Sequence, residues 1–215
     1  MPASWLTPLE PAREARLSLA ELWHGLLAGE YLVLNSSYAE TQCVARLRRV
    51  ERPVPLKQRR AKILHRVLLG ESPKVVALEQ GIAISSITGA CSDCLSATGA
   101  GRWTSRAPMW LSMAAHAGIG CRLPDPAVRT LGGPQSEILE MRCRRPDLSL
   151  KDRLTRAEYL VARLYLEGDS HVKIANQCHS APRTVANQLA SVFRKLRTSG
   201  RTDLLSRLIR EQWPQ

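Results

Sequence analysis

The pattern of apolar and polar residues predicts a run of short helices between residues 154 and 208. The first helix should end before Gly168, because glycine readily adopts the left-handed conformation that closes a helix. Asp169 or Ser170 can cap the second helix, over residues 172–177, since a short side-chain oxygen satisfies the free N–H groups of a first turn.

A tight corner at residues 178–180 is expected to lead into a third helix that runs to about Leu196. Ser180 is a second capping residue, and Pro182 fits the first turn because the missing N–H of proline would be unpaired there. The apolar positions keep to one face at i, i+4, i+7 and i+11: Val185, Leu189, Val192 and Leu196. The opposite face is polar and basic, so it is free to contact another molecule.

Two pairs of short apolar runs predict β-hairpins ahead of the helical stretches. A helix that is capped by Ser18 and ends at Gly29 precedes the first hairpin. The predicted strands cover residues 30–34 and 42–48 in the first hairpin, with an Asn-Ser-Ser break between them, and residues 127–131 and 137–143 in the second.

The stretch from Leu56 onward repeats the C-terminal helical pattern at a constant offset of 98 positions, without a gap. The matches are Leu56 with Leu154, Gly70 with Gly168, Ser72 with Ser170, Val76-Ala77 with Ile174-Ala175, and Ile87 with Val185. Once a few extra residues are allowed, Ser105-Arg106 aligns with Gly200-Arg201, which marks a fourth helix in each half. We interpret this as an internal duplication.

These patterns predict a mainly α protein with two tandem helix-turn-helix units of four helices, each preceded by a short β-hairpin. The expected divisions are a flexible N-terminal tail (1–16), a diverged first unit (17–117), a linker (118–126) and a second unit (127–215).

Helix, three-residue turn and helix is the arrangement that places a recognition helix in the major groove of DNA. The C-terminal stretch carries a gapless series of motif residues: Leu154, Thr155, Glu158, Glu167-Gly168, Ile174-Ala175, Thr184-Val185, Leu189, Lys195-Leu196 and Arg201-Thr202. This series, over about a quarter of the chain, resembles the LuxR-type helix-turn-helix family. Ala157, Ala186 and Gln188 depart from the family pattern.

The resemblance implies a bacterial transcription regulator that binds double-stranded DNA through the third helix of the second unit. Resemblance and geometry together place Arg183, Thr184, Asn187 and Gln188 toward the groove, and Lys173, Arg194 and Lys195 near phosphates. The competing interpretation is a non-catalytic adaptor that docks on another regulator or on the transcription machinery.

The corresponding helix of the first unit, residues 85–98, differs because it carries only Asp93 and no Lys or Arg. It also contains Gly89, which costs about 1 kcal/mol in a helix interior relative to Ala. Phosphate neutralisation supplies much of the affinity of a recognition helix. We therefore expect the first unit to serve in pairing or partner docking rather than in reading bases.

The two fourth helices are candidate pairing elements, because the fourth helix commonly pairs subunits in the resembled family. The candidate pairing residues are Trp110, Met113, Leu204, Leu205 and Leu208. The helices could pair within one chain, or the neutral unit could join two chains. We favour a homodimer, because a doubled site multiplies the modest energy of each base contact.

Charge and composition agree with a polyanion as partner, since the net charge is +12. No apolar run is long enough for a membrane span, and we expect a cytoplasmic protein that is associated with the nucleoid. The six cysteines are expected to be reduced structural thiols, with no metal and no cofactor. Catalysis is not expected, because the sequence has no phosphate-binding glycine loop, nucleophile elbow or paired carboxylates.

Overall fold

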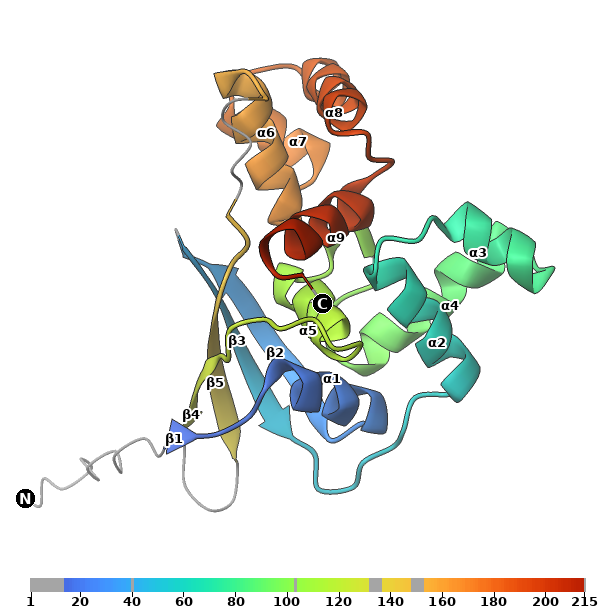
Figure 1. The fold of residues 1–215 in the computed structure, drawn as a ribbon, viewed down its shortest axis with the longest axis vertical. Coiled ribbons are helices and arrows are strands. Elements are labelled where there is room, and N and C mark those ends of the chain that lie inside the picture. Colours follow the sequence, from blue (N-terminus) through green and yellow to red (C-terminus); the bar gives the residue numbers. More distant parts are fainter. Residues whose placement is uncertain (1–13, 40, 103, 132–136, 148–152, 215) are drawn as a thin grey trace, which may run out of the picture.

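The computed structural model describes residues 14–39, 41–102, 104–131, 137–147 and 153–214. Within these residues the fold is mainly α with one antiparallel sheet, and the helices lie to one side of that sheet (Figure 1). Most of the predicted N-terminal tail lies outside the described residues. Its last part is not a tail, because Glu14–Ala15 forms strand β1 at one edge of the sheet.

Both predicted hairpins are present, formed by β2 (Tyr31–Tyr38) with β3 (Gln42–Arg49) and by β4 (Ala127–Leu131) with β5 (Ile138–Arg144). Strand β2 is longer than predicted, because it continues through the Asn-Ser-Ser sequence that was expected to break it. A register shift lies between Val33 and Asn35, after which the strand resumes its pairing with β3.

The two hairpins join into a single sheet through antiparallel pairing of β3 with β5, in the order β1-β4-β5-β3-β2. Cys43 lies directly opposite Cys143 in this pair. The side chains that point toward the helices are buried, among them Cys43, Ala45, Leu47, Leu139, Met141 and Cys143. The expected linker at residues 118–126 therefore connects two halves that share one sheet and one core.

Helices α1 (Leu19–Ala28) and α5 (Met109–Ala117) pack on each other beside the inner face of the sheet. The predicted Ser18 cap is confirmed as a capping box with Glu21, and Gly29 closes α1 in the left-handed conformation. Two contacts tie α5 to β2: Trp110 Nε1 donates to Ser36 Oγ at 3.0 Å, and Tyr38 Oη accepts from the Met109 N–H at 2.9 Å.

The helices between the hairpins follow the predicted 98-residue spacing. Helices α2 (Gln58–Leu68), α3 (Pro73–Gln80) and α4 (Ile84–Ala97) begin 98 positions before α6 (Arg156–Leu166), α7 (His171–Gln177) and α8 (Pro182–Leu196), respectively. Left-handed residues recur at the same spacing: Gly70 and Gly168, Gly81 and His179, and Gly99 and Arg197. The two sets of three helices therefore have matching starts and matching turns.

Helix α9 (Arg201–Gln212) packs on α5 in the centre of the molecule (Figure 1). His116 Nε2 lies 3.0 Å from Ser206 Oγ, and that hydroxyl donates to the Leu69 carbonyl at 2.6 Å. All five candidate pairing residues are buried in this single chain: Trp110, Met113, Leu204, Leu205 and Leu208. In this fold the five residues are therefore covered within one chain, and the homodimer stays a prediction.

In the described part of the chain, no single helix is long and apolar enough to cross a bilayer. Helices α3 and α4 together have the length and composition of a span, but they are bent by 112° at the break between them.

Candidate nucleic-acid interface

Helices α6, α7 and α8 form a small unit with a hydrophobic cluster of its own. The buried members of this cluster are Val161, Leu164, Ile174, Ala175, Val185 and Leu189. Ser170 caps α7 by accepting from the Lys173 N–H at 3.3 Å, which confirms one of the two predicted caps. The unit thus holds α8 by packing on both preceding helices.

The family-like Thr-x-x-Glu sequence forms a capping box at the start of α6. Thr155 Oγ1 accepts from the Glu158 N–H at 3.3 Å, and Glu158 Oε2 accepts from the Thr155 N–H at 2.8 Å. The same carboxylate accepts from Lys195 Nζ at 2.7 Å. The Lys195 ammonium, followed by the capping bonds, lowers the pKa of Glu158 to about 2. Lys195 therefore joins the end of α8 to the start of α6.

Helix α8 has the two faces that its sequence predicts. Val185, Leu189, Val192 and Leu196 are buried, with at most 2% of each side chain exposed. On the opposite face Arg183, Thr184 and Asn187 are exposed and Gln188 is half-buried. The polar face is therefore available to a ligand along the first half of the helix.

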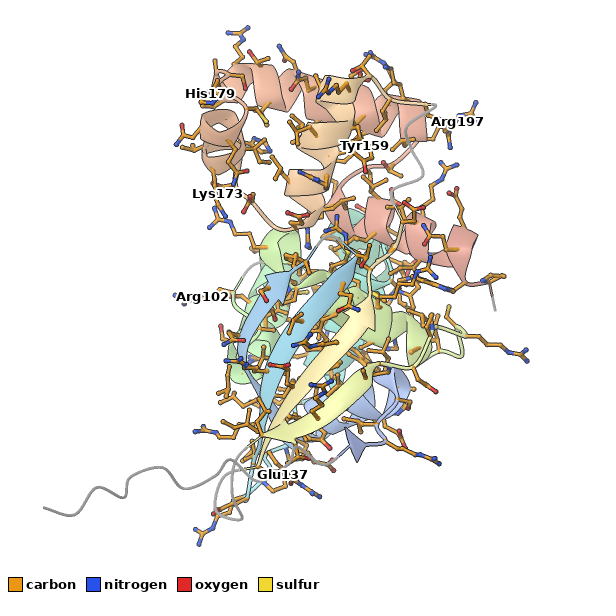
Figure 2. The ribbon with its side chains drawn as sticks, turned by 90° about the vertical axis from the view of Figure 1, so that its left-hand side faces the viewer. Arg102, Glu137, Tyr159, Lys173, His179 and Arg197 are labelled. Carbon is orange, nitrogen blue, oxygen red and sulfur yellow. The ribbon has the colours of Figure 1, made fainter. Side chains whose placement is uncertain are left out.

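The three residues expected near phosphates differ in their partners. Lys173 Nζ donates to Asp169 Oδ1 at 2.6 Å across an i,i+4 pair, and Lys195 is bound to Glu158. Arg194 is exposed and makes no ion pair among the described residues. Figure 2 shows Lys173 and His179 near one end of the α7–α8 unit and Arg197 near the other. Of the three residues expected near phosphates, Arg194 is thus the one that no carboxylate of the described residues neutralises.

The turn between α7 and α8 differs from the prediction in one respect. The N-cap of α8 is Ala181 and not Ser180, and it offers no side-chain hydrogen bond to the helix. The Ser180 hydroxyl is instead enclosed, without a hydrogen-bond partner in the described structure. The positive end of α8 therefore has no side-chain acceptor, a condition that favours an anion such as a DNA phosphate. Sequence reasoning missed this because a serine at that position usually caps.

Arg201, one of the motif residues, is not part of the exposed basic surface. It is buried and donates to the carbonyls of Tyr165 at 3.1 Å, Leu166 at 2.6 Å and Thr104 at 3.3 Å. Burial lowers its pKa. Arg201 therefore satisfies the free carbonyls at the end of α6 and links the second unit to the first.

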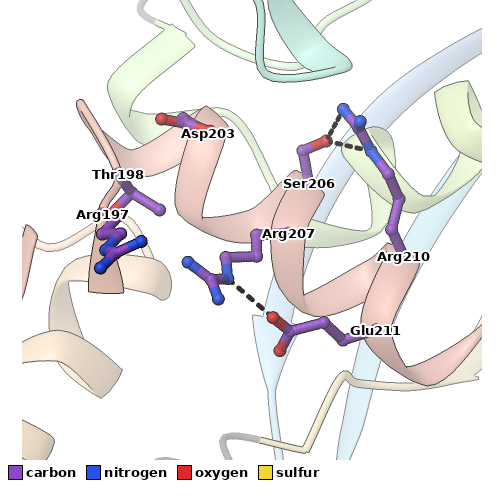
Figure 3. A pocket seen from close by; sticks show the side chains of 7 residues that line it. All are labelled: Arg197, Thr198, Asp203, Ser206, Arg207, Arg210 and Glu211. Carbon is purple, nitrogen blue, oxygen red and sulfur yellow. Dashed lines mark hydrogen bonds and ion pairs between the residues drawn. The ribbon is translucent and has the colours of Figure 1, made fainter. Parts of the chain in front are cut away.

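A shallow hollow beside α9 is also basic, and two of its arginines form hydrogen bonds within the protein (Figure 3). Arg207 donates to Glu211 at 2.7 Å and to the Leu196 carbonyl, and Arg210 donates to Ser206. The lining residues are Arg197, Thr198, Asp203, Ser206, Arg207, Arg210 and Glu211. These contacts hold α9 in place and engage Arg207 and Arg210 within the protein.

The cysteines show no arrangement of a metal site within the described residues. Five of them are buried and Cys178, in the α7–α8 turn, is half-buried. Burial raises the pKa of Cys91 to about 12, which keeps its thiol protonated.

Comparison with protein families identifies the helical unit. Residues 152–208 match the family model described as bacterial regulatory proteins, luxR family. This segment is thus similar to helix-turn-helix domains of the LuxR type, and the similarity suggests a DNA-binding regulator of transcription. The comparison gives no support to a diverged second copy in the N-terminal half. No curated protein and no solved structure matched the chain.

The capping carboxylate yields a stability prediction. Glu158→Gln should lower the free energy of unfolding at pH 7 by roughly 2 kcal/mol, because it removes a charge that accepts three hydrogen bonds. The pKa of Glu158 is depressed, so the stabilisation is complete above its ordinary value of 4.5 and is lost as the pH falls toward 2. Urea unfolding across this pH range measures the change in the free energy of unfolding.

The matched control is Glu211→Gln, which removes a carboxylate from an exposed i,i+4 pair with Arg207. It should change stability by no more than about 0.5 kcal/mol. Equal losses in the two variants would contradict the structural role of Glu158.

Proposed function

We propose that this protein is a bacterial transcription regulator that binds duplex DNA by placing α8 in the major groove. The observation that carries the proposal is the division of α8 into a buried apolar face and an exposed polar face, within a segment that matches the luxR family. A helix held in this way can enter a groove without disturbing its own core. The protein would act in the cytoplasm, in association with the nucleoid.

The exposed face of α8 supports separate roles for its residues. Asn187 and Gln188 can each bond bidentately to adenine, and Arg183 can pair with guanine. Thr184 lies beside them near the uncapped start of the helix, where its N–H can reach a phosphate. Arg194 is the first candidate for a contact with a DNA phosphate. Lys173 and Lys195 must share their charge with Asp169 and Glu158, and would add less.

The proposal includes a diverged helix-turn-helix unit in the N-terminal half. Support comes from the 98-residue spacing, at which both the helix starts and the left-handed turn residues coincide. In this unit Gly89 stands where α8 has Asn187, so an amide proposed to read bases is absent. Leu78 stands where α7 has the polar Asn176. Both differences favour pairing or docking for α3 and α4.

We further propose that pairing takes place inside the chain. The α5–α9 contact and the β3–β5 contact each join an element of one half to the corresponding element of the other. One chain then has the arrangement of a dimer but presents only one base-reading helix. It would bind a single half-site.

A specific observation favours the second candidate function, that of an adaptor without DNA. Leu78 is 84% exposed, and Val75 and Ile84 on the same pair of helices are each 46% exposed. Exposed apolar residues of this size mark protein contacts more often than nucleic-acid contacts. A DNA-binding regulator would retain duplex DNA at low salt, whereas an adaptor would retain none.

Asn187→Ala tests the base-reading role. Duplexes selected by the full chain from a random library should lose about 1–3 kcal/mol of affinity, roughly 5- to 150-fold, at particular base pairs, because a bidentate contact to adenine is lost. Titration of single-base variants of the selected duplex measures the position of the loss.

Gln58→Ala is the control, because Gln58 is an exposed amide at the start of α2, a helix that lies away from both α8 and the sheet. It should leave the affinity unchanged. An equal loss on every duplex in Asn187→Ala would count against base reading. Failure of the wild-type chain to retain any duplex at low salt would establish the adaptor instead.

The internal pair predicts the assembly state. In solution the protein should have the mass of one chain, 23.9 kDa, and should protect one non-palindromic half-site on the selected duplex. Light scattering after size exclusion and a footprint measure these quantities. A doubled mass together with a protected inverted repeat would refute the internal pair and restore the homodimer.

A further inference from the structure

The outer face of the sheet is uncovered by any helix of the described structure, and it is strongly basic. Side chains at even positions of β3 and β5 point away from the core, as the alternation of buried and exposed residues requires. Figure 2 looks onto this face, below α6. The arginines that lie on it are Arg46, Arg48, Arg129, Arg142 and Arg144, and all five are exposed.

A single carboxylate stands in the middle of these arginines. Glu140 is directly opposite Arg46 on β3 and Arg129 on β4. It accepts from Arg46 Nε at 3.2 Å and from Arg142 Nη2 at 2.9 Å. The bond from Arg142 is the main reason that the pKa of Glu140 is lowered, so the carboxylate stays charged. The face thus carries five positive charges and one negative charge. Glu140 holds the side chains of Arg46 and Arg142 in place, but it does not neutralise the surface.

The chemistry of this face fits the phosphate backbone of duplex DNA. All its basic residues are arginines, whose planar guanidinium binds phosphate oxygens in pairs. Arginines two residues apart on one strand are about 6.8 Å apart, so they form rows along β3 and β5. Single-stranded nucleic acid is bound through aromatic stacking. The described outward positions of β3, β4 and β5 carry no aromatic residue, which disfavours a single strand.

The face is also separate from the proposed groove-reading helix. The sheet stands at the left of Figure 1 and α8 at the upper right, with α6 and α9 between them. A straight duplex seated on α8 therefore does not also cover the sheet. We propose that the outer sheet face, through Arg48, Arg129, Arg144 and their neighbours, binds the backbone of a second duplex segment without reading its sequence. The protein then bridges two segments of DNA.

Three of the arginines can be changed without removing an ion pair in the described structure: Arg48, Arg129 and Arg144. In the test, a duplex selected by the protein is immobilised, the full chain is bound to it, and capture of a labelled duplex of unrelated sequence is measured against salt. The combined variant Arg48→Gln, Arg129→Gln and Arg144→Gln should lose this capture at the salt concentration at which the wild-type chain still captures. At lower salt, where capture by the variant can be measured, the slope of log affinity against log salt should be less steep by up to about 2.7, since each phosphate contact contributes about 0.9.

The matched control removes the same charge from three exposed arginines outside the sheet face, as Arg52→Gln, Arg102→Gln and Arg122→Gln. It should keep the capture, and both triple variants should still bind the immobilised duplex. Capture that is lost equally in the control, or that persists in the sheet variant, would overturn the proposal. So would the absence of any capture by the wild-type chain, an outcome that would leave the role of α8 intact and point to an acidic protein at the sheet.

Discussion

The packing of α9 on α5 is the contact on which the rest of this structure depends. Both helices carry buried apolar side chains, among them Leu205 on α9 and Trp110 on α5, which have no exposed surface. A polar link accompanies the contact, because His116 lies against Ser206, whose hydroxyl donates to the end of α2. Together with the pairing of β3 and β5, this contact makes two sequence halves into one body with one core.

The position of the α6–α8 unit follows from that contact. Helix α9 begins at Arg201, whose guanidinium holds the end of α6 and also reaches the segment before α5. Arg145 at the end of the sheet binds Glu167 at 2.9 Å, which anchors α6 a second time. Helix α8 is therefore carried by a unit that is fixed from both the helical and the sheet side. In the proposed function, the buried α5–α9 surface pairs the two halves inside the chain, and α8 is left for DNA recognition.

Local features of the fold could be predicted from the sequence, and most distant contacts could not. The Ser18 cap, the left-handed Gly29 and Gly168, and the two faces of α8 follow from short-range rules. The pairing of β3 with β5, the bond from Lys195 to Glu158 and the burial of Arg201 join residues that are far apart in the chain. No periodicity encodes these contacts. For the candidate site, the polar face of α8 could be predicted from the helical spacing, and its role in binding DNA stays a prediction. The carboxylates that bind Lys173 and Lys195 could not be predicted.

The central claim is that α8, and not its counterpart α4, meets DNA. The most direct measurement is the change in backbone amide NMR signals of the isotope-labelled full chain when a short selected duplex is added. The account predicts that the largest changes among the helices fall on Arg183, Thr184 and Asn187, while Ser85 and Thr88 on α4 keep their positions. Large changes on α4 with α8 unaltered would contradict it.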